Sequence, residues 1–190
     1  MLRVRNRDVL FVVGVGLKKE HLTDEAKKVI SRAKKVYGSA KAIKIAEDWI
    51  VGEKVIMKKF GEEIYREIER ESEESDVVVL STGDPMVAGL GKFFRDAEIV
   101  PGISSVQVAL GRIKADLCEV SVLNAHSQEP GFSEERNLMI LAKKGVRLEF
   151  LGKRMIVLEN LEGEDEKIYQ VQDTFETESD YTVVFVEVKK

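Results

Sequence analysis

Cysteine, histidine and the motifs of common hydrolases are scarce or missing in this 190-residue sequence. Cys118 is the single cysteine, which excludes an internal disulfide and a zinc site built from cysteines. His21 and His126 are the two histidines and stand far apart, and neither H-E-x-x-H nor G-x-S-x-G occurs. The sequence therefore predicts no metal site and argues against hydrolysis by an activated nucleophile.

An excess of positive charge and long apolar runs are also missing. The 30 Lys and Arg residues are outnumbered by 34 Asp and Glu residues, so the chain lacks the basic field that generic nucleic-acid binding requires. No apolar run approaches the ~20 residues that cross a membrane. The start is basic and then apolar, but it lacks the cleavage pattern of a signal peptide. We expect a cytoplasmic protein that binds neither nucleic acid nor membranes.

Runs of strand length alternate with helical periodicity over the first 115 residues, which is typical of a parallel sheet with crossover helices. The unalternated apolar run Val77–Leu80 indicates a strand that is buried on both faces. The predicted strands cover residues 8–16, 53–60, 76–80 and 97–100. The predicted helices cover 22–36 with Thr23 as N-cap, 62–74, a short glycine-weakened stretch after Pro85, and a segment capped by Ser104 or Ser105 that runs to Ile113.

The pattern changes after Leu117, where strand-like runs follow one another with little helix between them. These runs cover residues 118–126, 137–142, 153–160 and 181–188. We therefore predict an α/β protein with an N-terminal domain at residues 1–115 and a smaller C-terminal domain at 116–190.

Three glycine-bearing loops follow directly on predicted strands, at residues 14–23, 81–85 and 101–105. The carboxyl ends of parallel strands lie at one edge of a sheet, where open α/β sheets bind their ligands, so we predict a binding cleft there. Each loop taken alone is equally well explained as a tight turn between strand and helix. The first loop is not a dinucleotide fingerprint, because Lys19 stands where the third glycine would be.

Glycine loops and a carboxylate, without a metal site or a strong nucleophile, suit methyl transfer from a sulfonium donor. The leaving group of such a donor is already activated, so the enzyme mainly has to hold two reactants in line. Asp84, which stands between Gly83 and Pro85, could accept hydrogen bonds from the donor. It could equally cap a helix that begins after Pro85, and the two roles are compatible.

The sequence resembles the tetrapyrrole (corrin/porphyrin) methylase superfamily over essentially its whole length. "VVVLSTGDP" at residues 77–85 and "EIVPGISSVQVALGRI" at 98–113 match its paired signature, and "VGVG" followed by "LT" matches its opening segment. "PGISSVQ", His126 and "VLENLEGEDEKI" at 157–168 most resemble the branch that methylates carbon 5 of cobalt-precorrin-7 in cobalamin biosynthesis. The opening loop departs from the family pattern, since Leu17 and Lys18 stand where Pro and Gly are usual.

The resemblance implies two α/β/α domains, the first with a mostly parallel sheet and the second with a mixed sheet, with S-adenosylmethionine in the cleft between them. It also implies a homodimer and an anionic tetrapyrrole substrate. The donor contacts that it implies are Thr82, Gly83, Asp84, Val87, Ser104 and Ser105, with Leu141, Ala142 and Leu158 as the nearest matches in the second domain.

Cations are needed to bind the acetate and propionate groups of such a macrocycle. Lys18 and Lys19 are the first candidates, and His126 is a candidate for contact with the substrate or for catalysis. Further candidates are Arg95, Lys143, Lys144, Arg147, Lys153 and Arg154.

Other interpretations remain open at this point. The enzyme could methylate another carbon of a corrinoid, or it could act on a diphthamide precursor or on ribosomal RNA. The chain could also be a non-catalytic module that binds S-adenosylmethionine. The local sequence alone favours helix caps for Ser104 and Ser105, a solvated loop for Lys18 and Lys19, and a strand end for His126. The family's pathway includes a methyltransferase that acts at carbon 15, which we expect on another chain as a pathway partner.

Overall fold

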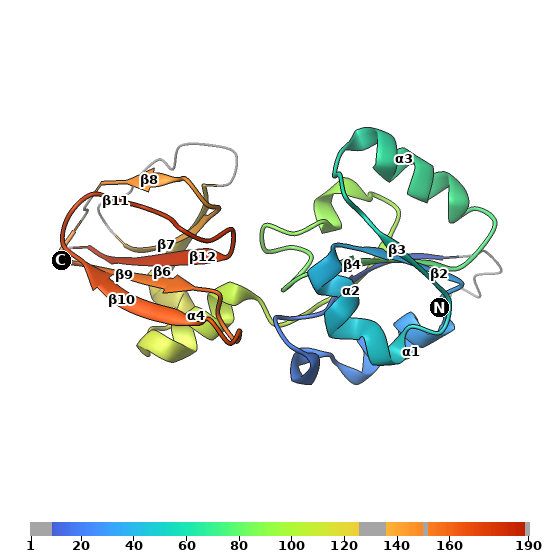
Figure 1. Ribbon diagram of the computed structural model, residues 1–190, viewed down its shortest axis with the longest axis horizontal. Coiled ribbons are helices and arrows are strands. Elements are labelled where there is room, and N and C mark those ends of the chain that lie inside the picture. The colour runs from blue at the N-terminus through green and yellow to red at the C-terminus, as the bar shows by residue number, and fades with distance from the viewer. Residues whose placement is uncertain (1–8, 126–135, 150–151, 189–190) are drawn as a thin grey trace. The chain divides into compact units, whose positions relative to one another are not determined.

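The computed structural model describes residues 9–125, 136–149 and 152–188, and the chain forms two compact units, Met1–Ser104 and Ser105–Lys190 (Figure 1). The division falls earlier in the chain than the expected boundary between residues 115 and 116. The reason is helix α4 (Ser105–Ile113), which contacts strand β12 (Thr182–Glu187) of the second unit. No helix in the described ranges is both long and apolar enough to cross a membrane.

The first unit is built on a five-stranded sheet in which every neighbouring pair is parallel, as predicted. Strand β4 lies between β2 and β1, and all five of its residues are buried, which confirms a strand covered on both faces. The sheet order is β3-β2-β4-β1-β5. The strands are β1 (Leu10–Gly14), β2 (Lys35–Gly38), β3 (Glu53–Ile56), β4 (Val77–Ser81) and β5 (Glu98–Val100).

Helices cover both faces of this sheet (Figure 1). Val13 of β1 packs in one cluster with Ile30 of α1, whereas Val12 packs in another with Ile68 of α3, because successive strand residues point to opposite faces. Thr23 caps α1 by accepting the Ala26 N–H at 3.1 Å, as predicted. The helices are α1 (Asp24–Arg32), α2 (Ala40–Ala46) and α3 (Glu62–Glu71), with 3-10 turns at Lys19–His21, Glu47–Trp49 and Gly91–Phe93.

The helix predicted over residues 22–36 is too long. It ends at Arg32, and Ala33 is already extended, with φ −65° and ψ 137°. Val36 then lies fully buried in β2, between β4 and β3. The prediction failed because apolar residues at 29, 30, 33 and 36 keep helical spacing across the break, although the last of them belongs to a central strand. Strand β2 and helix α2 were therefore not predicted.

The second unit contains a mixed five-stranded sheet in the order β10-β9-β12-β7-β6. The β6–β7 pair is parallel and the other pairs are antiparallel, so the predicted mixed sheet is confirmed. The predicted strand-like runs correspond to β6 (Val120–Asn124), β7 (Asn137–Ala142), β9 (Arg154–Glu159) and β12. Strand β10 (Lys167–Val171) was not predicted.

Different elements pack on the two faces of the second sheet (Figure 1). Helix α4 lies on one face and buries Val106, Ala109 and Leu110. A two-stranded sheet of β8 (Arg147–Leu148) and β11 (Phe175–Glu176) lies on the other, where Leu148 joins a core cluster with Ile140. A 3-10 turn at Leu117–Glu119 connects α4 to β6.

Candidate functional site

The three predicted loops meet where the neighbouring strands β4, β1 and β5 end. The Val15 N–H donates to the Ser81 carbonyl at 3.0 Å, and Gly16 and Gly83 exchange two backbone hydrogen bonds of 3.1 and 2.9 Å. Gly16 and Gly83 have φ of +67° and +74°, which glycine adopts without strain. The prediction that these loops gather at one sheet edge is therefore confirmed.

The third loop approaches the other two so closely that a side chain would not fit. A Cβ atom added to Gly14 would lie 2.6 Å from the Gly102 nitrogen and 2.8 Å from the Gly83 carbonyl oxygen. Ordinary van der Waals contact begins at 3.4 Å. The backbones of all three loops are therefore in direct contact, and glycine is required at position 14 for space.

The Asp84 carboxylate braces two of these loops. Its Oδ1 accepts the Met86 N–H at 2.7 Å, and its Oδ2 accepts the Gly102 N–H at 3.0 Å. Asp84 is half-buried, and each carboxylate oxygen has a second lone pair that these contacts leave available. The side chain therefore has a structural role within the first unit and retains the capacity to accept hydrogen bonds from a ligand.

Of the short helix predicted after Pro85, only a 3-10 turn at Gly91–Phe93 forms. Residues 86–90 form turns, and the Gly91 N–H donates to the Pro85 carbonyl at 2.9 Å. A Cβ atom on Gly89 would lie 2.7 Å from that same carbonyl oxygen, so the chain folds back tightly on itself. Asp84 therefore caps a turn rather than a helix, and the glycines that were expected to weaken a helix replace it by a compact loop.

The other predicted donor contacts of the first unit flank this meeting point. Thr82 and Val87 are half-buried, and Ser104 is 2% exposed. Helix α4 begins at Ser105, so the predicted start of this helix is confirmed. Contact of these four residues with a donor stays a prediction.

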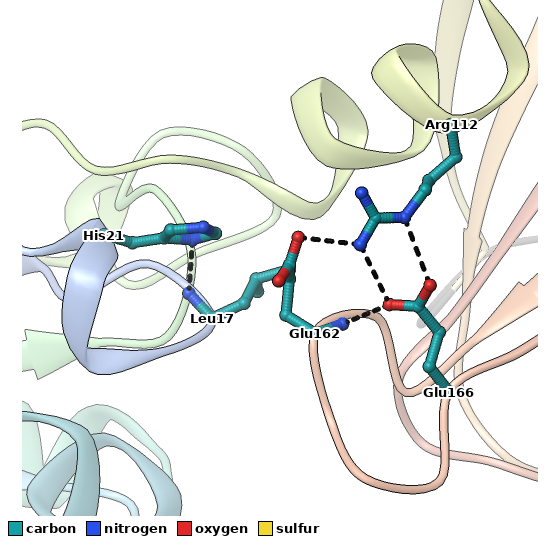
Figure 2. Close-up of polar contacts among 5 residues, drawn as sticks. All are labelled: Leu17, His21, Arg112, Glu162 and Glu166. Carbon is teal, nitrogen blue, oxygen red and sulfur yellow. Dashed lines mark hydrogen bonds and ion pairs between the residues drawn. The ribbon is translucent and has the colours of Figure 1, made fainter.

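The first loop is held by a histidine that the sequence did not single out for this role. The Leu17 N–H donates to Nδ1 of His21 at 3.3 Å, so this nitrogen carries no proton (Figure 2). Lys18 is half-buried in the same loop. Lys19 is exposed, and its Nζ pairs with Oδ2 of Asp48 at 2.7 Å; this contact is the first cause that raises the pKa of Lys19. Lys19 must share or leave Asp48 to bind a substrate carboxylate.

The predicted contacts of the second unit lie side by side on its sheet. Leu141 of β7 and Leu158 of β9 both pair with Val183 of β12. Ala142 pairs with Thr182 in the adjacent row, and all three predicted residues are buried. The register therefore brings together residues that are distant in sequence, at one end of the sheet.

A polar network fixes the loops at that end of the sheet, and the sequence did not predict it. Glu159 is only 1% exposed, and its Oε1 accepts the Glu178 N–H at 3.1 Å and the Thr182 hydroxyl at 3.3 Å. The Thr177 hydroxyl donates to the Lys143 carbonyl at 2.5 Å. Burial raises the pKa of Tyr169, and the negative charge of Glu159 raises it further. The network has no local sequence signal, because its members come from strand ends and loops that are distant in the sequence.

The candidate cations of the second unit fall into separate groups. Lys143 and Lys144 are exposed and directly follow Ala142, at the same end of the sheet as Leu158. Lys153 and Arg154 stand at the opposite end of β9, where Arg154 pairs with Glu187 at 3.1 Å. Arg147 lies in β8, Arg95 is exposed in the first unit, and His126 lies outside the described residues.

Comparisons with known proteins place the chain in a family. Residues 9–187 match the model of the Tetrapyrrole (Corrin/Porphyrin) Methylases. The crystal structure of the cobalamin-biosynthesis precorrin-6Y methylase of Archaeoglobus fulgidus matches with a TM-score of 0.87 and 42% identity, covering 96% of this chain and 100% of that one. The probable cobalt-precorrin-7 C(5)-methyltransferase of Methanocaldococcus jannaschii is 28% identical over 190 residues, covering 84% of this chain and 87% of that protein.

A further relative matches over a shorter stretch. The probable cobalt-factor III C(17)-methyltransferase of Methanothermobacter thermautotrophicus is 30% identical over 125 residues, which is 60% of this chain. The match spans only 36% of that protein's length. Because the family model matches from the first strand of the first unit to the last strand of the second, this chain belongs to the tetrapyrrole (corrin/porphyrin) methylases.

Proposed function

We propose that the protein transfers a methyl group from S-adenosylmethionine to carbon 5 of cobalt-precorrin-7 in cobalamin biosynthesis. The observation that carries this proposal is the 42% identity to the precorrin-6Y methylase of Archaeoglobus fulgidus over 96% of the chain. The Methanocaldococcus jannaschii relative, named as a probable C(5)-methyltransferase, supports the same carbon. Membership of the tetrapyrrole methylases makes the protein a C-methyltransferase, and S-adenosylmethionine is the donor that this family uses.

In this proposal each unit contributes its own set of donor contacts. The first unit contributes Thr82, Gly83, Asp84, Val87 and Ser104 around the meeting point of the three loops. The second unit contributes Ser105, Leu141, Ala142 and Leu158. Support comes from the tight backbone contact in the first unit and from the shared register in the second.

The reaction needs positioning and electrostatics rather than a protein nucleophile. An electron-rich ring carbon of the substrate attacks the methyl carbon, and the electron pair of the breaking C–S bond stays on sulfur, which becomes a neutral thioether. Asp84 is held in a fixed orientation by two backbone N–H groups. Its negative charge favours the sulfonium donor over the neutral product, so it contributes to donor binding and product release, while the acceleration of the reaction comes from positioning.

The substrate in this proposal is an anionic tetrapyrrole, bound through Lys18, Lys19 and His126. Lys143 and Lys144 are further candidates, because they follow the strand that carries Leu141 and Ala142. The proposal also includes a homodimer, a cytoplasmic location, and a partner methyltransferase on another chain that acts at carbon 15.

Turnover with an isotope-labelled methyl donor tests the function. We expect cobalt-precorrin-7 to gain one methyl group by mass spectrometry, and nuclear magnetic resonance to place the label on carbon 5. A label on another ring carbon, such as the carbon 17 named for the Methanothermobacter relative, would contradict the regiochemistry. If the protein binds S-adenosylmethionine but methylates no tetrapyrrole, the proposed methyltransferase activity would be wrong and the chain would be a binding module.

Asp84→Ala tests the donor site. Loss of a charge-assisted hydrogen bond should weaken S-adenosylmethionine binding by about 1–3 kcal/mol, measured by calorimetry. Asp116→Ala is the matched control, because Oδ1 of Asp116 accepts the Cys118 N–H at 2.7 Å, the same distance as in the Asp84–Met86 contact. The control should keep its affinity. A folded Asp84→Ala variant with unchanged affinity would leave Asp84 only as a brace.

A further inference from the structure

Three charge-assisted hydrogen bonds from Arg112 connect helix α4 to the loop at residues 160–166 (Figure 2). Nη2 of Arg112 lies 2.9 Å from Oε1 of Glu162, and Nε of Arg112 lies 3.1 Å from Oε1 of Glu166. Nη2 also donates to the second oxygen of Glu166 at 3.4 Å, so Arg112 holds that carboxylate with two nitrogens. We call this set of three residues the Arg112 fork.

The Arg112 fork differs from the ordinary ion pairs on a protein surface. The Glu162 and Glu166 side chains are 13% and 24% exposed, whereas Arg112 is 41% exposed. Isolated exposed pairs contribute little, but a two-nitrogen contact within a network of charges fixes geometry. The fork therefore restrains both elements that it joins.

The loop that the fork holds has an unusual backbone. Asn160 and Glu162 have φ of +50° and +66°, in the left-handed region that residues other than glycine rarely adopt. The Glu162 N–H donates to Oε2 of Glu166 at 2.6 Å, and the same carboxylate is gripped by Arg112. Both the backbone and the side chain of Glu162 are thus tied to the fork. Asparagine adopts this region more readily than other side chains, whereas a glutamate there is strained; such residues persist where their surroundings hold them, and they cluster at functional sites.

The fork joins helix α4, which begins at Ser105, to the loop that follows strand β9, which carries Leu158; Ser105 and Leu158 are both donor contacts in the proposed function. Helix α4 begins at Ser105, about two turns before Arg112, and the loop begins directly after Leu158 and Glu159 of β9. We propose that Arg112 is a positioning residue for the methyl donor. It keeps the helix of Ser105 and the backbone at Leu158 in the relation that donor binding requires. This inference rests on the proposed function.

Calorimetric titration with S-adenosylhomocysteine tests the role. Arg112→Ala should raise the Kd about 5- to 30-fold, the size expected when coupled contacts are lost. Arg112→Lys keeps a cation but not the planar pair of nitrogens, so its Kd should lie between those of the wild type and Arg112→Ala. Arg66→Ala is the control, since it removes another arginine ion pair, of 2.8 Å to Glu62 on α3, and should leave the Kd within about twofold of wild type.

A double-mutant cycle separates positioning from a general loss of stability. Arg112→Ala combined with Glu166→Gln should raise the Kd little more than Arg112→Ala does, because both changes break the same coupling. Three outcomes would overturn the inference. The Kd of the double variant could rise by the product of the two single effects, the Kd of a folded Arg112→Ala variant could stay unchanged, or Arg66→Ala could raise the Kd as much as Arg112→Ala does. If Arg112→Ala does not fold, Arg112→Lys and Glu166→Gln carry the test, and unchanged Kd values in both overturn it.

The same titration distinguishes this inference from the proposed function. Wild-type protein that does not bind S-adenosylhomocysteine would overturn both. Wild-type binding with unchanged affinity in the Arg112 variants would overturn only the positioning role and leave the proposed function standing.

Discussion

Replacing Gly14 by alanine tests whether the close contact of the three loops determines both stability and donor binding. The new methyl group would lie 2.6 Å from the Gly102 nitrogen, about 0.8 Å inside the 3.4 Å limit of ordinary contact. Its neighbours are backbone atoms, which have no flexible side chain to move aside. The Gly102 nitrogen is also held by Asp84 at 3.0 Å, so a shift of this loop stretches that hydrogen bond.

The expected cost follows from these contacts. Overpacking costs about 1–3 kcal/mol, and loss of a hydrogen bond to a charged group costs about 1.5–3 kcal/mol. We therefore expect Gly14→Ala to lower the free energy of unfolding by about 2.5–6 kcal/mol, measured by denaturant titration. The Kd for S-adenosylhomocysteine should rise in the fraction that stays folded.

Gly111→Ala provides the matched control. Gly111 lies within α4, and a Cβ added there would meet no described atom within 4 Å apart from its chain neighbours and the backbone of its own helix. The same substitution should raise the free energy of unfolding by about 0.5–1 kcal/mol, because alanine favours the helix. Gly14→Ala with wild-type stability and affinity would refute the reasoning, since the loops could then separate without cost.

Three further predictions concern the pH dependence of stability and the core. A hydrogen bond from Tyr37, supported by Lys35, lowers the pKa of Glu71 below 4.5, so the free energy of unfolding should fall as the pH drops through that range, and Glu71→Gln should flatten this decline. Burial, followed by the bond to Glu71, raises the pKa of Tyr37 to about 12, so stability should decline above pH 10.0, and Tyr37→Phe should make that decline shallower. Unchanged slopes in urea titrations across pH would contradict either statement. Ile140→Ala should lower the free energy of unfolding by about 2–5 kcal/mol, because Ile140 is fully buried. Val122→Ala, at a side chain that is 41% exposed, should lower it by less than about 1 kcal/mol. Equal losses in the two variants would be inconsistent with the core described above.

Local signals predicted the elements whose evidence lies within a few residues. Thr23 precedes an acidic first turn and an apolar stripe, so the start of α1 was readable from its cap. The run Val77–Leu80 shows no alternation because β4 has a strand on each side and helices on both faces. The glycine loops were located because each directly follows a run that the sequence predicts as a strand.

Contacts between distant segments could not be predicted in the same way. Arg112 and Glu162 are separated by 50 residues, and neither has a local motif that names its partner. The register that aligns Leu141 with Leu158 exists only because β12, the last strand, pairs with both β7 and β9. The loop after Pro85 was misread for the opposite reason. Helical spacing was present locally, but the Gly91 N–H donates to the Pro85 carbonyl, and the chain between them folds back so tightly that a Cβ atom on Gly89 would not fit.

The structural role of Asp84 and its proposed role in donor binding follow from one chemical property. Two backbone N–H groups from different loops point at its side chain, so the residue must offer two acceptors and no donor. A carboxylate meets this condition, whereas Asp84→Asn would direct an NH2 group at one of the N–H donors. The same condition leaves a fixed negative charge at the edge of the sheet, which suits a cationic sulfonium. Asp84→Asn should therefore lower stability and donor affinity together, although it changes almost no volume.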